Sequence, residues 1–364
     1  MWFTSDNAGP AHPAIIEAIA RANAGYAPSY GAEDAMARVT AAIRAIFEAP
    51  EAAVYLVATG TAANALALAC LCPPWATVYC HRNAHVEEDE CGAPEFYTGG
   101  AKLTLLGGDS ARIAPEALER ALAMTAPRGV HGVQKGALTL TNATELGTVY
   151  SPDAIARLCA VAQGAGVPVY VDGARFANAL VALGCTPADL TWRAGVDALS
   201  FGGTKNGLIG VEAVILFDPA RGWEFELRRK RGGHLFSKHR YLSAQMEAYL
   251  ADGLWLELAA LANARAAALS RGLAAMRGAR ILYPTEANMV FAAWPRAGHE
   301  AAQAAGARYH PWTLTPQPDG SGDAAPSARL VCNWATTEAE VADFLAAVAG
   351  EASRSAPDTG ELTR

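Results

Sequence analysis

The sequence predicts an α/β protein with a doubly wound, mainly parallel sheet, followed by a smaller α+β domain. Two observations support this prediction. Up to residue 217, short apolar segments alternate with segments in which apolar residues recur at helical spacing. From residue 279 onward, three further apolar segments are interleaved with helical ones.

The expected strands of the large domain are short and apolar, as is typical of parallel strands buried on both faces. They lie at 53–58, 76–80, 102–106, 137–140, 167–171, 196–199 and 211–217. The first helix begins at His12-Pro13, with proline in its first turn. Helices are expected from Pro13 to about Asn23, at 33–48, from Ala62 onward, and at 115–123, 152–165 and 241–277.

The chain is expected to have four parts. They are an irregular arm (1–12), a large domain (13–245), a small domain (246–350) and a frayed tail (351–364). The stretch 241–277, interrupted near Asp252-Gly253, links the two domains. The small domain has expected strands at 279–283, 288–292 and 328–332, helices near 298–305 and 337–349, and a flexible loop at 316–326.

Composition narrows the class of protein. The net charge is −7 and the pI about 5.7, which argues against a nucleic-acid partner. Only 18% of residues are charged and 52% are hydrophobic, so the core can be large and other subunits could cover apolar surface. The N-terminus lacks the features of a signal peptide, and no apolar run is long enough to span a membrane.

The cysteines indicate a reducing compartment. Their number, seven, is odd and they are widely spaced, which favours free thiols over a disulfide framework. Cys70 and Cys72 lack the second pair that a zinc site would need. We therefore expect a cytoplasmic protein without a bound metal.

A candidate phosphate site follows the strand at 53–58. Thr59-Gly60-Thr61 joins this strand to the helix expected from Ala62. Free backbone N–H groups and the helix dipole attract anions at such a point. The glycine-rich pattern of dinucleotide sites is absent, so Gly60 and Thr61 are expected to bind a single phosphate group.

Two charged residues lie where apolar strands end. Asp172 follows the strand at 167–171, and it is either a helix N-cap, a partner of Arg175 or the counter-ion of a buried cation. Lys205 lies between the apolar runs at 196–199 and 211–217, among small residues. A solvent-facing turn is the simpler interpretation of Lys205. Burial would instead lower its pKa and favour the free amine that attacks carbonyl groups.

Taken together, these features describe one cofactor. Lys205 can form a Schiff base with an aldehyde, Asp172 can hold a protonated pyridine nitrogen, and Gly60-Thr61 can hold a phosphate. These are the requirements of pyridoxal 5′-phosphate (PLP). Their order along a parallel sheet matches the aspartate-aminotransferase-like fold, with the cofactor bound by the large domain, 13–245.

The sequence resembles the low-specificity threonine aldolases of the beta-eliminating lyase group, over about residues 3 to 350. The segments that carry the resemblance are Ser5-Asp6-Asn7, Tyr30-Gly31, Thr59-Gly60-Thr61-Ala62-Ala63-Asn64, His85 with Asp89-Glu90-Cys91-Gly92-Ala93-Pro94-Glu95-Phe96, Asp172-Gly173-Ala174-Arg175-Phe176-Ala177-Asn178-Ala179, Ser200 to Gly207 and Arg229-Lys230-Arg231.

The resemblance implies the residues that bind the cofactor. Lys205 would carry it, Asp172 would hold its ring nitrogen, and Gly60 and Thr61 would bind its phosphate. Arg231 or Lys230 would help, from the same or a neighbouring subunit. Arg175 would also contact the cofactor. His85 would stack on the ring and lie near the substrate hydroxyl. Its alternative role is a strand-end histidine bonded to Glu88 or Asp89.

The resemblance also implies substrate-binding residues and a reaction. Arg175 and Arg329 would bind the substrate carboxylate with help from Ser5, and Tyr30 would approach across an interface. L-Threonine, L-allo-threonine and phenylserine-type amino acids would be cleaved to glycine and an aldehyde. His85 is the candidate base. The stretch 139–145, where related aldolases often have another histidine, has none.

Two other classes of function remain open at this point. One is another reaction on the same scaffold, such as β-elimination, racemisation or transamination. The other is a nucleotide-binding or structural α/β protein, which would leave Lys205 and Asp172 without a role. For the aldolase, the resemblance implies a homodimer or homotetramer.

Overall fold

The computed structural model describes residues 1–312 and 326–350, without the side chains of 126–128. It consists of two compact units, Pro10–Ala260 and Met1–Gly9 with Leu261–Arg364, so that the boundary falls within one helix. The domain boundaries expected from the sequence were 12/13 and 245/246. The tail 351–364 and most of the loop expected at 316–326 lie outside the described residues.

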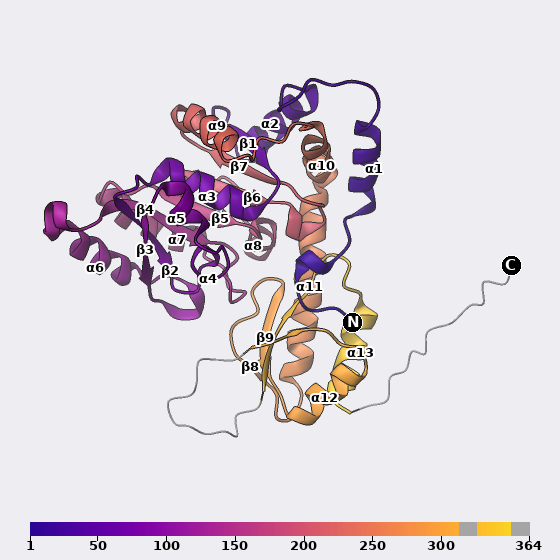
Figure 1. Cartoon of the computed structure of the whole chain (residues 1–364). Coiled ribbons are helices and arrows are strands. Elements are labelled where there is room, and N and C mark those ends of the chain that lie inside the picture. The colour runs from indigo at the N-terminus through magenta and orange to yellow at the C-terminus, as the bar shows by residue number, and fades with distance from the viewer. Residues whose placement is uncertain (313–325, 351–364) are drawn as a thin grey trace. The chain divides into compact units, whose positions relative to one another are not determined.

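The larger unit is built on a seven-stranded sheet with the order β1-β7-β6-β5-β4-β2-β3 (Figure 1). Its strands are β1 Ala53–Val57, β2 Ala76–His81, β3 Lys102–Leu106, β4 Gln134–Thr141, β5 Val169–Gly173, β6 Ala198–Gly202 and β7 Glu212–Leu216. The five strands from β3 to β6 pair in parallel, whereas β7 is antiparallel to both of its neighbours. The predicted mainly parallel α/β sheet is therefore confirmed.

Burial on both faces explains the composition of the central strands. Every residue of β2, β5, β6 and β7 is buried, and most of these residues are apolar. The charged exceptions, Asp172 in β5 and Glu212 in β7, lie at or near the ends of their strands. Because a buried charge needs partners, these two residues indicate where to look for a site.

Helix α3, Gly60–Leu71, packs across β1, β7, β6, β5 and β4. All its residues from Ala62 to Leu71 are buried, and five of them are alanine, which lets the helix lie close to the sheet. The sequence placed its start at Ala62. It begins at Gly60 instead, because the Thr59 hydroxyl accepts the N–H of Ala62 and caps the helix.

The other helices of the larger unit surround this sheet. They are α1 Pro13–Ala22, α2 Asp34–Ile46, α4 His85–Glu88, α5 Ala93–Thr98, α6 Pro115–Thr125, α7 Pro152–Gly164, α8 Phe176–Leu183, α9 Gly222–Arg231 and α10 Arg240–Leu250. The sequence analysis did not delimit α4, α5, α8 or α9. Two of these are single short turns, and α8 is almost uniformly apolar, which gives it no clear helical stripe.

The expected break near Asp252-Gly253 is confirmed. Helix α10 ends at Leu250, Asp252 adopts a positive φ of 52°, and α11, Leu254–Ala274, begins directly afterwards.

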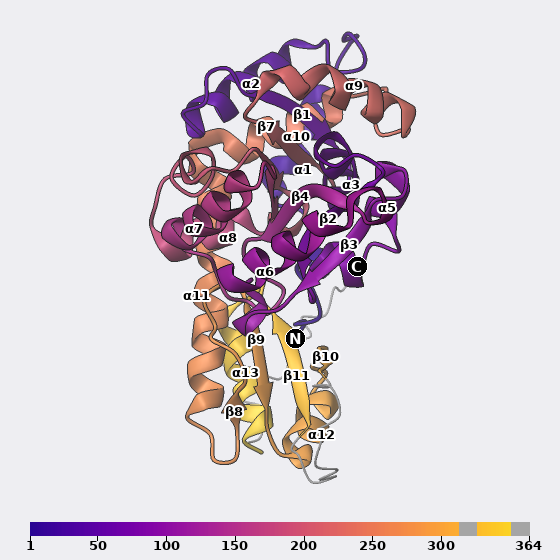
Figure 2. The same cartoon turned by 90° about the vertical axis from the view of Figure 1, so that its left-hand side faces the viewer.

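The smaller unit contains a four-stranded antiparallel sheet with the order β10-β11-β9-β8. Its elements are β8 Arg280–Ile281, β9 Met289–Ala293, α12 Arg296–Ala304, β10 His310–Pro311, β11 Ser327–Val331 and α13 Glu338–Val348. Buried residues of α11 and α13 pack with those of β9 and β11 around Trp294 and Phe344 (Figure 2). Phe3 of the N-terminal segment belongs to the same core, so residues 1–9 are part of this unit.

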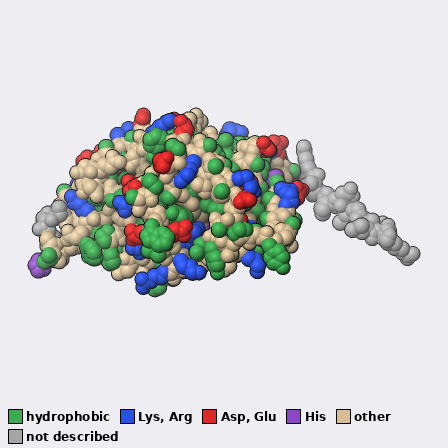
Figure 3. Space-filling model, turned by 90° about the horizontal axis from the view of Figure 1, so that it is seen from above, with side chains coloured by type: hydrophobic (Ala, Val, Ile, Leu, Met, Phe, Trp, Pro, Cys, Tyr) green, Lys and Arg blue, Asp and Glu red, His purple; other side chains and the backbone are tan. Residues whose placement is uncertain are grey.

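The surface of the protein is mixed in character. On the face shown in Figure 3, acidic, basic and hydrophobic side chains are interspersed. Among the described residues, no helix combines the length and the apolar character needed to cross a membrane.

Candidate active site

Three neighbouring parallel strands bring polar residues to one edge of the large sheet. Thr141 at the end of β4 is paired with Asp172 of β5, and Asp172 is paired with Ser200 of β6. The Ser200 hydroxyl also accepts the N–H of Gly173, at 3.1 Å. Ligands of open α/β sheets bind at this carboxyl edge, so the register places Asp172 where a cofactor is expected.

Lys205 lies in a single 3₁₀ turn, Thr204–Asn206, that directly follows β6. The turn is held from several sides: Asn206 donates to Tyr249 Oη at 2.7 Å, and Glu212 Oε2 accepts the N–H of Gly203 at 2.9 Å. Gly203 cannot carry a side chain here, because a Cβ would lie 2.7 Å from the backbone oxygen of Val211. Lys205 is half-buried, which disfavours the alternative of a fully solvent-facing turn.

Asp172 is 3% exposed and both its carboxylate oxygens accept hydrogen bonds. Oδ1 accepts the N–H of Ala174 at 3.0 Å, and Oδ2 accepts Nδ2 of Asn64 at 2.9 Å. Each carboxylate oxygen has a second lone pair, so Asp172 can accept a further N–H from a ligand.

Asn64 of α3 connects Asp172 to a second carboxylate. Its Nδ2 also donates to Glu90 Oε1 at 2.7 Å, and its Oδ1 accepts the hydroxyl of Tyr170 at 2.6 Å. Both amide hydrogens and the carbonyl oxygen of Asn64 are therefore in use. The sequence analysis assigned no role to Asn64, although a polar residue inside the apolar run of α3 was a visible signal.

His85 is the first residue of α4 and is held at two points. Its Nδ1 lies 2.9 Å from Glu90 Oε1, and its backbone N–H donates to Glu145 Oε1 at 2.7 Å. The alternative role named Glu88 or Asp89 as its carboxylate partner, but the carboxylate that contacts the ring is Glu90. Helix α4 ends at Glu88, and the chain then turns so that Glu90 points back to the ring.

The pKa of His85 depends on the charges of two other predicted site residues, Asp172 and Lys205. The hydrogen bond to Glu90 raises the pKa of His85 above its ordinary value, burial opposes this, and the charges of Asp172 and Lys205 act on it in opposite directions. Through Glu90 and Asn64, His85 is connected to Asp172 by hydrogen bonds, and Lys205 lies within electrostatic range of its ring.

Two further buried carboxylates lie within electrostatic range of Asp172. Burial raises the pKa of Glu145 and of Glu212 to about 7. Glu145 Oε1 also accepts the hydroxyl of Thr141 at 2.8 Å. Neither glutamate could be recognised as a site residue from the sequence, because only the tertiary fold brings them to this edge of the sheet.

Gly60 and Thr61 form the first turn of α3, at the carboxyl end of β1. The N–H of Ala62 donates to Thr59 Oγ1 and the N–H of Ala63 donates to the backbone oxygen of Thr59, each at 3.1 Å. The N–H groups of Gly60 and Thr61 precede these bonds in the helix, where an anion is favoured. The space above Gly60 is open, because a Cβ there would have no atom within 4 Å.

Arg231 and Tyr30 lie elsewhere in the larger unit. Arg231 is exposed at the end of α9 and lines a hollow of about 700 Å³ with Phe96 and Leu227. The Tyr30 ring lies 4.7 Å from Lys230 Nζ. Among the described residues, no hydrogen bond joins Arg231 to Gly60 or Thr61.

The remaining predicted residues are divided between the two units. Arg175 is the half-buried N-cap residue of α8, three positions after Asp172. Ser5 and Arg329 belong to the smaller unit, where Arg329 Nη2 donates to Thr4 O at 3.4 Å. The Ser5 hydroxyl accepts the N–H of Asn7 at 3.2 Å.

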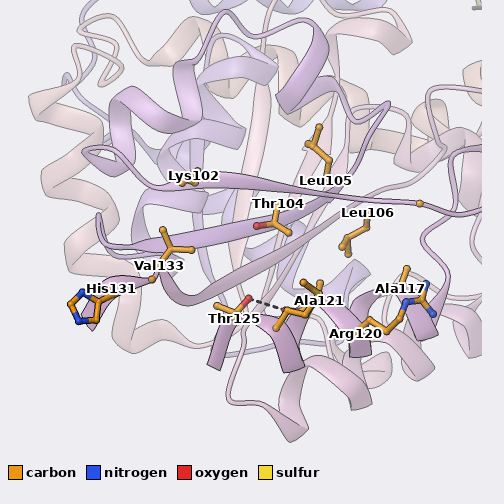
Figure 4. Close-up of a pocket in the computed structure, with 13 residues that line it drawn as sticks. Lys102, Thr104, Leu105, Leu106, Ala117, Arg120, Ala121, Thr125, His131 and Val133 are labelled. Atoms are coloured by element: carbon orange, nitrogen blue, oxygen red, sulfur yellow. Dashed lines mark hydrogen bonds between the residues drawn. The ribbon is translucent and has the colours of Figure 1, made fainter. Parts of the chain in front are cut away.

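A separate hollow of about 590 Å³ lies between β3, α6 and residues 131–133 (Figure 4). Lys102, Arg120 and His131 are among its lining residues, and Thr125 donates to Ala121 O at its base. It includes none of the predicted site residues, so we do not place the active site there.

The residues at the sheet edge fit PLP. Asp172 retains acceptor capacity for a ring N–H, Lys205 supplies an amine, and the first turn of α3 supplies free N–H groups for a phosphate. Glu90 Oε2 and Glu145 Oε2 are buried and have no hydrogen-bond partner among the described residues. Such orphaned atoms are typical of a site built for a ligand.

Comparison with known proteins supports this fit. The family model for beta-eliminating lyases matches residues 3–295. The chain is 40% identical to a low specificity L-threonine aldolase from Pseudomonas sp. (strain NCIMB 10558) over 344 residues, which is 94% of this chain and 96% of the relative. A protein of the same description from Pseudomonas aeruginosa is 40% identical, with 92% and 93% covered.

A solved structure gives the same answer for the fold. The Leishmania major threonine aldolase superposes with a TM-score of 0.88 at 28% identity, covering 95% of this chain and 98% of that one. The predicted PLP fold is thereby confirmed. Because the family model covers most of the sequence and both curated relatives match it nearly end to end, the chain belongs to the beta-eliminating lyase family of PLP-dependent enzymes.

Proposed function

We propose that this protein is an aldolase that cleaves β-hydroxy-α-amino acids to glycine and an aldehyde. L-Threonine, L-allo-threonine and phenylserine-type amino acids are its substrates. The observation that carries the proposal is the cluster of Lys205, Asp172 and His85 at the carboxyl edge of the sheet, in a chain that is 40% identical to low specificity L-threonine aldolases.

When bound, PLP supplies a carbon to which an amine can add and a conjugated ring that accepts the electron pair released at Cα. Lys205 Nζ would hold this group and give up its place to the substrate amine. Asp172 would keep the ring nitrogen protonated by accepting its N–H. Gly60 and Thr61 would bind the phosphate, with Arg231 of a second copy of the chain as a further contact.

The remaining protein chemistry is a proton transfer. Breaking the Cα–Cβ bond requires that the β-hydroxyl lose its proton, and a base must lie within hydrogen-bond reach. His85 takes that proton on its ring nitrogen. The charge of Glu90 beside it favours the protonated ring that results.

Substrate orientation depends on a second set of residues. Arg175 and Arg329 bind the substrate carboxylate, Ser5 assists them, and Tyr30 approaches from a neighbouring subunit. Support for these roles comes from the sequence resemblance.

We further propose a cytoplasmic homodimer or homotetramer. The seven cysteines, all among the described residues, form no disulfide, which suits a reducing compartment. Phe96 and Leu227, which line the same hollow as Arg231, are 78% and 53% exposed, as an apolar subunit contact requires. Small amino acids are the expected ligands, with no nucleic acid and no membrane partner.

A product assay and a covalent-labelling assay test the function. With PLP present, L-threonine, its allo isomer and phenylserine should each give glycine and an aldehyde in equal amounts. Keto acid or ammonia in place of glycine would establish transamination or β-elimination, the alternative reactions on this scaffold. Glycine formation should disappear when PLP is removed and return when it is added.

Substitution of Lys205 tests its role directly. Borohydride reduction followed by peptide mass spectrometry should find the cofactor on Lys205 in the parent protein. The Lys205→Ala variant should not form this adduct. Its kcat should be lower by a factor of at least about 10³, the loss expected when a covalent nucleophile is removed. Lys238→Ala, an exposed lysine, is the matched control. An adduct elsewhere, or full turnover of Lys205→Ala, would contradict the proposal.

A further inference from the structure

The His85–Glu90 pair has an unusual asymmetry of burial. The Glu90 side chain is fully buried and the His85 side chain is 31% exposed. The ring therefore has one nitrogen, Nδ1, directed at a buried carboxylate. The other nitrogen, Nε2, is the one left to face a ligand.

Counting donors and acceptors shows where the histidine proton lies. Asn64 uses one hydrogen of Nδ2 on Asp172 and the other on Glu90 Oε1, since its Oδ1 is occupied by the Tyr170 hydroxyl. Glu90 Oε1 is thus an acceptor. With Glu90 ionised, this oxygen can only accept, so Nδ1, 2.9 Å away, is the donor in that contact.

We propose that Glu90 is a positioning residue that keeps a hydrogen on Nδ1 of His85, so that Nε2 is the nitrogen that exchanges a proton with the substrate. The inference rests on the proposed function, in which His85 moves the hydroxyl proton. The inference adds which nitrogen of His85 exchanges the proton, and that Glu90 is the residue that determines it. A carboxylate that orients a catalytic imidazole in this way also holds its tautomer in other enzymes.

The protonation of the pair follows from its surroundings. Glu90 raises the pKa of His85, and burial raises the pKa of Glu90. Nδ1–H persists whether the second proton is on Nε2 or on Glu90 Oε2, which is buried and has no partner among the described residues. In both cases Nδ1 keeps its hydrogen, so Nε2 is the ring nitrogen at which a proton can be gained or lost.

Other charged groups face His85 from the elements around it. Asp172 of β5 favours the protonated ring and Lys205 of the turn after β6 opposes it. Glu145, which follows β4, contacts the backbone N–H of His85 rather than its ring. Glu90 is therefore the carboxylate whose removal should have the largest effect on the titration of the ring.

The experiment is a titration of the PLP-loaded protein carrying ring-¹⁵N-labelled histidine, followed by long-range ¹H–¹⁵N correlation. His85→Asn assigns the His85 signals. In the parent protein, Nδ1 should have the shift of a protonated nitrogen on both sides of the midpoint, and only Nε2 should change. Nδ1 appearing as the unprotonated nitrogen of the neutral ring would overturn the proposal, and this measurement needs no Glu90 variant to fold.

Glu90→Gln provides the second measurement. Glutamine keeps an oxygen acceptor but removes the charge, so the His85 midpoint should fall by about one pH unit, and the acidic limb of kcat/KM should fall with it. Glu87→Gln makes the same chemical change at an exposed position of α4 and should move neither. An unmoved midpoint in Glu90→Gln would refute the role of Glu90.

The two readouts separate this inference from the proposed function. The tautomer and the titration midpoint of His85 are observed without turnover, so they test the role of Glu90 even if threonine is not a substrate. Conversely, glycine production with an Nε2–H tautomer would retain the aldolase and remove Glu90 from this role.

Discussion

The larger unit contains two histidine–glutamate pairs with the same geometry and different surroundings. In both, Nδ1 lies 2.9 Å from a glutamate Oε1: His85 with Glu90, and His239 with Glu33. The His85 side chain is 31% exposed, whereas that of His239 is fully buried. Glu33 also accepts the hydroxyl of Ser243 at 2.6 Å.

The surroundings give the two imidazoles opposite pKa shifts. For His85, the bond to Glu90 outweighs burial and raises the pKa. For His239, burial is the larger effect and lowers the pKa. Burial alone would raise the pKa of Glu33. Hydrogen bonds from Ser243 and His239 outweigh this effect, so the net shift of the Glu33 pKa is downward. Glu33 is therefore an anion beside a neutral ring.

The comparison shows that a hydrogen-bond distance does not determine the role of such a pair. Access to a ligand does, because protonating the buried His239 would leave an N–H at Nε2 with no acceptor among the described residues. We infer that the His239 pair holds α10 to the segment before α2, whereas the His85 pair exchanges a proton.

The largest expected difference is between the two histidines. His85→Asn should lower kcat/KM by about 10²- to 10⁴-fold, as for loss of a general base, and change the free energy of unfolding little. His239→Asn should lower the free energy of unfolding by about 2 kcal/mol, because it disrupts a buried network, and leave kcat/KM nearly unchanged. Steady-state kinetics and urea unfolding check both, and interchanged effects would contradict the assignment.

The glutamates should differ in the pH dependence of stability. Because the pKa of Glu33 is lowered in the folded protein, this residue contributes stability at pH values above its ordinary pKa near 4.5. That contribution is lost as the pH falls through the pKa of Glu33 in the folded protein. The pKa of Glu145, raised to about 7, gives stability that is present below 4.5 and lost as pH rises through about 7.

Glutamine at each position should therefore shift unfolding in opposite senses. Glu33→Gln should be less stable than the parent at pH 7 by about 1–2 kcal/mol, with a gap that narrows in acid. Glu145→Gln should gain about 2 kcal/mol relative to the parent between pH 4.5 and 8. Urea unfolding at three pH values measures both, and gaps that change in the same direction would be incompatible with this account.

The smallest expected effect concerns the residues that connect each pair to its surroundings. Asn64→Ala removes the donor shared by Asp172 and Glu90, and it should weaken PLP binding about tenfold, which corresponds to about 1.4 kcal/mol. Ser243→Ala removes a similarly buried hydrogen bond next to Glu33 and should leave PLP binding unchanged. Equilibrium titration with PLP distinguishes the two, and equal losses would imply a general packing effect.

Much of the fold could be predicted from the sequence, because buried parallel strands and striped helices have clear periodicities. The strand at 102–106 was delimited correctly, and most others were close. The order of Gly60-Thr61, Asp172 and Lys205 along the chain also pointed to the cofactor, because each follows an apolar strand. Short helices such as α4 were missed, since a single turn has no repeat to detect.

The partners of His85 show the limit of such reasoning. For a strand-end histidine, the carboxylates considered as alternative partners were Glu88 and Asp89, which are close in sequence. The partner is Glu90, because α4 is only four residues long and Asp89 leaves the helical conformation with φ −127° and ψ 7°. Glu145 is 60 positions from His85, and sequence spacing carries no information on a contact of that separation.

The position of Thr61 and Asn64 on one helix, α3, limits the insertions that this family can tolerate. Thr61 and Asn64 are on the same rigid helix, so their separation along its axis is fixed at about 4.5 Å by the helical rise. One residue inserted between them would rotate Asn64 by about 100° away from Asp172, while the residues at the start of the helix kept their place. The spacing between these two positions should therefore be invariant in length, even where the residue types change.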